Sequence, residues 1–143
     1  MKNLKTVMIM CAMTASISAF SQSSEVNAVK ETITAFSKAG DNNNSKELAK
    51  YLDDNYRVVM NRLFGSKEVS ILPRAVYIQK IESKEFGDDK RELTIEDVKI
   101  NGSTACAKVT FTGSKMTFVS FIILVKGEDG NWKLVSDIPM IKV

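Results

Sequence analysis

The chain has 143 residues, of which 44% are hydrophobic and 26% are charged, and its formal net charge is +3. This length predicts one domain with a single core, and the small net charge does not favour a nucleic-acid-binding protein. The sequence contains no His, which excludes nucleophiles activated by a Ser-His-Asp or Cys-His arrangement and any metal site built on His. It also lacks a Gly-rich phosphate-binding motif and the spacing of a calcium loop, so we expect no metal and no cofactor.

Residues 1–21 have the three parts of a secretory signal peptide. Basic residues are followed by an apolar run over 7–13 and then by small residues, with no Asp or Glu. We expect cleavage between Ser21 and Gln22 and export of the remainder to the periplasm or the medium. Hydroxyl residues interrupt the apolar run well before the ~20 residues that a membrane span needs, so we expect no membrane-spanning segment. The remainder, 22–143, is expected to be a single domain.

The exported part is predicted to open with two helices. Apolar residues at spacings of three and four predict an amphipathic helix over 24–39. We expect Ser24 to cap its start and Gly40 to adopt the left-handed conformation past its end. Asn44, with Glu47 three residues later, resembles a capping box and predicts a second, short helix.

A β-hairpin and a third helix are predicted next. Residues 56–63 alternate as a strand does, 64–66 form a turn, and a return strand starts at Val69. Pro73 suits the first turn of a helix over 73–84. This helix is expected to present three residues to the core: Tyr77, Ile78 and Ile81.

Everything after Lys90 is predicted to be antiparallel sheet. A change of parity near Glu96 predicts a bulge, and the pair Asn101-Gly102 predicts a tight hairpin. The strand over 115–126 is apolar on both faces, whereas a strand with one solvated face alternates. One face carries Met116, Phe118, Ile122 and Leu124, and the opposite face carries Val119, Phe121, Ile123 and Val125. The helices cover one face, and either a sheet closing on itself or a second copy of the chain covers the other; we favour a homodimer.

Three stretches carry a resemblance to a known fold: 48–59 (LAKYLDDNYRVV), 73–77 (PRAVY) and 130–137 (GNWKLVSD). With these motifs in this order over 24–140, the chain resembles the nuclear transport factor 2-like superfamily, and within it the lumazine-binding-like and polyketide-cyclase-like branches. The resemblance implies an α+β, cone-shaped fold. Three helices from the N-terminal half would pack on a curved, mostly antiparallel sheet that leaves a cavity at its open end. Small exported bacterial proteins and homodimers through the sheet face are further implications of the resemblance.

The enzymes of this superfamily carry acid–base groups inside the cone, and this chain departs from them at two points. Ketosteroid-isomerase-like members use an Asp late in the first strand, where this chain reads VVMN over 58–61. Cyclase-like and dehydratase-like members use a His, which this chain lacks. The resemblance therefore favours a non-catalytic domain that binds a small apolar or aromatic molecule in its cone, or an interaction module if the cone is filled. The residues predicted to line that site are Tyr56, Met60, Tyr77, Phe118, Phe121 and Trp132.

Asp137 leaves an enzymatic alternative open. A carboxyl buried in an apolar setting has a raised pKa and can act as a general base. With Tyr56 or Tyr77 as a hydrogen-bond donor, it would give an isomerase-like or dehydratase-like enzyme. Strict alternation along the last strand, however, puts Asp137 in phase with Lys133 and opposite Trp132, which predicts that it faces solvent. An inward-facing Asp137 beside a Tyr hydroxyl would favour the enzyme.

Overall fold

The structure, a computed structural model, describes residues 2–142, with side chains from Gln22 onward. The side chains of the predicted signal peptide therefore lie outside the described residues. Within that range the elements, in chain order, are α1 (Lys2–Asp41), α2 (Ser45–Lys50), β1 (Leu52–Asn61), a 3-10 turn (Leu63–Gly65), β2 (Val69–Pro73), α3 (Arg74–Glu82), β3 (Glu92–Asn101), β4 (Thr104–Thr112), β5 (Thr117–Lys126) and β6 (Trp132–Ile141). None of the helices among the described residues is both long enough and apolar enough to cross a membrane.

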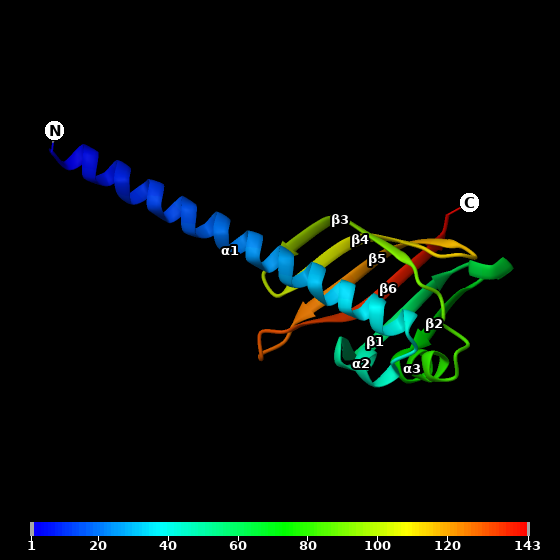
Figure 1. Ribbon diagram of the computed structural model, residues 1–143. Helices are drawn as coiled ribbons and strands as arrows, with labels where there is room; N and C mark the ends of the chain where they lie inside the picture. Colours follow the sequence, from blue (N-terminus) through cyan, green and yellow to red (C-terminus); the bar gives the residue numbers. More distant parts are fainter. Residues whose placement is uncertain (1, 143) are drawn as a thin grey trace.

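The strands form one sheet in the order β2-β1-β6-β5-β4-β3. Neighbouring strands are antiparallel except β1 and β6, which run parallel. In Figure 1, α1 crosses one face of the twisted sheet, and α2 and α3 lie beside its end, near β1 and β2. The predicted α+β architecture, with helices from the first half of the chain on a curved and mostly antiparallel sheet, is confirmed.

The core lies between α1 and the inner face of the sheet. On α1 the buried residues Val29, Ile33 and Phe36 follow the spacing of one helical face. On β4 every second residue is buried, from Ala105 to Phe111, as an alternating strand requires. Apolar side chains from these two surfaces exclude water from each other, and this burial is the main stabilising contribution to the fold.

Both predicted ends of the first helix are wrong. Helix α1 begins at Lys2, so the backbone before Ser24 is helical and Ser24 does not cap the start of the helix. At the other end it continues through Gly40 to Asp41, and the left-handed residue is Asn43, with φ at 53°. Gly40 instead lies under α2, where a Cβ would be 3.3 Å from Cδ1 of Leu48. Glycine at position 40 thus serves close packing of two helices.

Three local predictions are confirmed by the backbone. Asn44 caps α2 by accepting a hydrogen bond from the Glu47 amide at 3.1 Å. Asn101 and Gly102 join β3 to β4 in a tight hairpin, with Gly102 at a φ of 58°. The predicted bulge lies in β3, where the register shifts between Glu96 and Lys99.

A second bulge, in β6, was not predicted and reverses the orientation of the residues that follow it. Leu134 pairs with Leu124 and Ser136 pairs with Ile123, so Val135 is the extra residue between them. Because one inserted residue changes the parity of a strand, Asp137 faces the same side as Leu134.

Candidate functional site

Asp137 points into the core, and the predicted solvent-facing orientation is wrong. Its partners across the two neighbouring strands are Val58 and Ile122, both buried on the inner face. Asp137 is only 8% exposed, and its Oδ1 has no hydrogen-bond partner among the described residues. Ser120, which is also buried, lies two residues from Ile122 on the same face of β5 and therefore beside Asp137 in the sheet.

Two tyrosines face this carboxyl from other elements. Tyr56 comes from β1 and Tyr77 from α3, and their ring centroids are 5.4 Å apart. The Tyr56 side chain is 1% exposed, and its hydroxyl has no hydrogen-bond partner among the described residues. Tyr56 lies two residues from Val58, the partner of Asp137 on β1, and the charge of Asp137 raises the pKa of both phenols. We call Asp137, Tyr56 and Tyr77 the acid–tyrosine cluster.

Aromatic rings enclose the cluster from the helical side. Phe36 of α1 lies 6.4 Å from Tyr56 and 6.3 Å from Tyr77, measured between ring centroids. Phe86, in the segment between α3 and β3, lies 6.1 Å from Tyr77. These separations are typical of packed aromatic pairs, so the polar groups sit in an apolar and weakly solvated environment.

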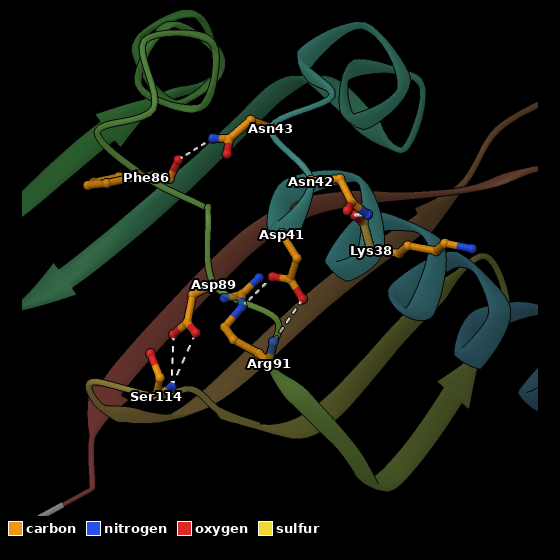
Figure 2. A network of polar contacts seen from close by, with 8 residues as sticks. All are labelled: Lys38, Asp41, Asn42, Asn43, Phe86, Asp89, Arg91 and Ser114. Carbon is orange, nitrogen blue, oxygen red and sulfur yellow. Dashed lines mark hydrogen bonds and ion pairs between the residues drawn. The ribbon is translucent and has the colours of Figure 1, made fainter.

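Polar contacts outside the cluster hold the segment that carries Phe86, residues 83–91 (Figure 2). The Asn43 amide donates to the carbonyl oxygens of Ile81 and Phe86, at 2.8 and 2.6 Å. The carboxylate of Asp89 accepts from the backbone N–H of Ser114 at 3.1 Å. The segment is therefore held by the α1–α2 loop on one side and by the β4–β5 turn on the other, with Phe86 packed against Tyr77.

Arg91, at the end of this segment, supplies a positive charge that acts on the cluster. Its Nε donates to Oδ1 of Asp41 at 2.6 Å (Figure 2). The guanidinium lies over the Phe111 ring, 4.6 Å from the ring centroid. Its charge lowers the pKa of Asp137 and of both tyrosines. Arg91 thus lies within electrostatic reach of the cluster, although its ion pair is with Asp41.

The protonation states follow from burial. Burial raises the pKa of Asp137 to about 6, a rise that the Ser120 hydrogen bond and the Arg91 charge partly offset. Burial also raises the pKa of Tyr56 and Tyr77 above the ordinary value, so both phenols stay protonated at neutral pH. Asp137 can therefore hold or accept a proton near neutrality while a tyrosine donates a hydrogen bond to a carbonyl oxygen.

Only some of the predicted site residues come together. Tyr56 and Tyr77 belong to the cluster, and Met60 and Phe118 are partly buried against the core. Phe121 lies on the opposite face of β5 and is 42% exposed, so it cannot line the same site. Trp132 is buried at the start of β6, where its Nε1 donates to Glu25 of α1 at 3.0 Å, away from the tyrosines.

Sequence reasoning did not single out Ser120 or Arg91. Ser120 stands between the apolar residues Phe118 and Ile122 on the inner face of β5, which is a signal that could have marked it. Arg91 had no comparable signal, because its position depends on the path of residues 83–91. As for metals, the described residues contain no group of three or more Cys, Asp or Glu side chains that could hold an ion.

The family of the chain follows from its sequence. A profile of the family described as "Putative lumazine-binding" matches residues 24–138, which include the whole acid–tyrosine cluster. The chain belongs to this family. Comparison with curated protein sequences finds no significant match.

The fold of the chain is similar to that of solved nuclear transport factor 2-like (NTF2-like) structures. An NTF2-like protein of unknown function from Silicibacter pomeroyi has a TM-score of 0.74 at 20% identity, over 85% of this chain and 98% of that one. One from Shewanella baltica has a TM-score of 0.72 at 19% identity, over 84% and 95%. A ketosteroid isomerase-like protein from Erwinia carotovora atroseptica has a TM-score of 0.63 at 10% identity, over 83% and 97%. These likenesses establish the predicted NTF2-like fold.

Proposed function

We propose that this domain binds a small organic molecule against the acid–tyrosine cluster on the inner face of the sheet. The observation that carries the proposal is the pair of buried polar atoms without partners, Asp137 Oδ1 and the Tyr56 hydroxyl. Buried polar atoms are nearly always paired, and each unpaired one costs about 1–3 kcal/mol. A ligand that pairs with both atoms recovers that energy. Membership in a family described as lumazine-binding supports a binding role.

The chemistry of the cluster restricts the ligand. Tyr56 donates a hydrogen bond, which suits a carbonyl oxygen, and ionised Asp137 accepts one, which suits an adjacent N–H or acidic C–H. The rings of Phe36, Tyr77 and Phe86 suit a flat, apolar or aromatic body. Because Tyr56 is 1% exposed, a ligand reaches it only after a local opening of the structure, and we propose that residues 83–91 move aside.

Native mass spectrometry of gently purified protein tests this proposal. We expect a retained molecule as added mass on the protein, lost in the variants Tyr56→Phe and Asp137→Ala. The matched control is Tyr51→Phe, a tyrosine whose hydroxyl is already bound to Glu47 at 2.8 Å, outside the cluster. Equal retention in all variants would place the ligand elsewhere.

A second candidate function is proton transfer, as in an isomerase or a dehydratase. The observation that favours it is the pKa of Asp137, about 6, because a general base works best when its pKa lies near the working pH. Incubating the released ligand with the protein in heavy water separates the two functions. An enzyme exchanges a C–H beside the carbonyl for deuterium, and Asp137→Asn abolishes the exchange, whereas a binding protein leaves the C–H unchanged.

We propose that the outer face of the sheet forms a homodimer. A row of apolar side chains crosses it from Ile71 on β2 through Val59 and Ile138 to Phe121 on β5. Ile71 and Phe121 are 61% and 42% exposed, and a contiguous apolar surface of this kind marks an interaction site. Light scattering at micromolar concentration is expected to give twice the chain mass, and a clean monomer would exclude the dimer.

We also propose that the protein is exported after removal of residues 1–21. The composition of that segment supports this. When the full sequence is expressed, the intact mass of the purified protein is expected to be that of a chain starting at Gln22. The mass of a chain that still starts at Met1 would contradict export by this signal.

A further inference from the structure

A groove beside the cluster has a different chemistry from the cluster itself. It lies between the last turns of α1 and the start of β3 and has a volume of about 360 Å³. Three cations line it, Lys38, Lys90 and Arg91, against one carboxylate, Asp41. The carbonyl groups at the end of α1 offset about half a positive charge, so the groove keeps a positive excess. We call it the α1–β3 groove.

Arg91 is fixed by Asp41, and its side chain stays 22% exposed. Its Nε donates to Asp41 Oδ1 at 2.6 Å, and the backbone N–H of Arg91 donates to Oδ2 at 3.2 Å. The Cζ atom of Arg91 lies over the Phe111 ring, 4.6 Å from the ring centroid. Among the described residues, no side-chain or backbone oxygen accepts a hydrogen bond from either Nη. A fixed guanidinium with free Nη groups is suited to carboxylate and phosphate oxygens.

We propose that the α1–β3 groove binds the carboxylate or phosphate group of a small molecule, with Arg91 as its main contact and Lys38 and Lys90 at its rim. The two lysines are exposed and flexible, so they add charge rather than geometry. That this anion belongs to the molecule bound at the acid–tyrosine cluster rests on the proposed function. The ligand is then an acidic carbonyl compound.

The position of Arg91 links the two sites. Arg91 lines the groove, and its charge acts on Asp137, Tyr56 and Tyr77 inside the core. An anion bound to Arg91 therefore weakens the field that the arginine exerts on the cluster. Asp137, which faces Ser120 and the two tyrosines, is expected to hold its proton to a higher pH when the groove is filled.

Titration with inorganic phosphate and with benzoate, followed by NMR at low salt, tests the groove without an identified ligand. We expect at least one of the two anions to bind, and the double variant Lys38→Gln/Lys90→Gln to weaken binding about tenfold. Arg91→Lys keeps the positive charge but removes the planar guanidinium with its paired N–H donors, and it is expected to weaken anion binding by a similar factor. The control Lys30→Gln lies on α1 outside the groove and is expected to leave affinity unchanged.

Which anion binds more tightly distinguishes a phosphate ligand from a carboxylate ligand, and either result supports the groove. No binding of either anion, or equal affinity in all the variants, overturns the proposal. Asp137→Asn separates this proposal from the proposed function, because it is expected to remove the retained ligand and leave phosphate or benzoate binding intact.

Discussion

Replacement of Asp137 by Asn is expected to stabilise the protein at neutral pH and not in acid. In the folded chain burial raises the pKa of Asp137 from 3.8 to about 6. Between these two values the folded state binds the proton and the unfolded state does not, so the free energy of unfolding falls as the pH rises. A shift of about 2 pKa units corresponds to about 3 kcal/mol in all, of which about 2 kcal/mol is lost between pH 4.5 and pH 7.5.

Urea unfolding of both proteins at these two pH values, at one protein concentration, measures the effect. The stability of Asp137→Asn relative to the unmodified protein is expected to rise by about 2 kcal/mol from pH 4.5 to pH 7.5. Comparing the two pH values removes any constant cost of packing the amide. Asp54→Asn, at an exposed position of β1, is the matched control and is expected to give no such change. A pH-independent difference for Asp137→Asn would refute the assignment of a buried, destabilised carboxylate.

Three further predictions concern the cluster, the closing segment and the outer face. Tyr56→Phe removes a buried hydroxyl without a partner, so the free energy of unfolding in urea is expected to rise by about 1–3 kcal/mol; a loss of stability would reveal a hidden hydrogen bond. Gly87→Ala places a Cβ 2.4 Å from the Gly40 carbonyl oxygen at a φ of +85°, whereas Gly65→Ala has the positive φ of +82° in open space. The first is expected to lower the melting temperature clearly more than the second, and equal effects would contradict the tight packing of residues 83–91. Phe121→Glu is expected to give monomers in light scattering with an unchanged circular dichroism spectrum, and a persistent dimer would exclude that face.

The fold was largely predictable because most of its local signals agree with one another. The Asn44 cap, the Asn101-Gly102 hairpin and the alternation of β4 depend on neighbouring residues only, and all three appear in the structure. The two apolar faces of β5 are also present, with Ile122 buried on the inner face and Phe121 exposed on the outer.

The site was less predictable because it depends on irregularities of the backbone. The orientation of Asp137 is set by the extra residue Val135, and no Gly or turn signal in the sequence marks that bulge. The parallel pairing of β1 with β6 brings Val58 beside Asp137 across a long separation in the chain, which short-range patterns do not register. The position of Arg91 depends on the path of a loop. Strict alternation along the strand therefore predicted the wrong orientation for Asp137, the residue on which the candidate site depends.

The most direct test of ligand binding at the acid–tyrosine cluster is carbon-detected NMR of the Asp137 carboxyl. The small molecule released from the purified protein is added back to labelled protein that has been freed of it. We predict that the Asp137 carboxyl resonance and the Tyr56 ring resonances shift at the same ligand concentration, while those of the exposed Asp54 do not. Binding that shifts only resonances outside the cluster, or that leaves Asp137 unchanged, would contradict the account.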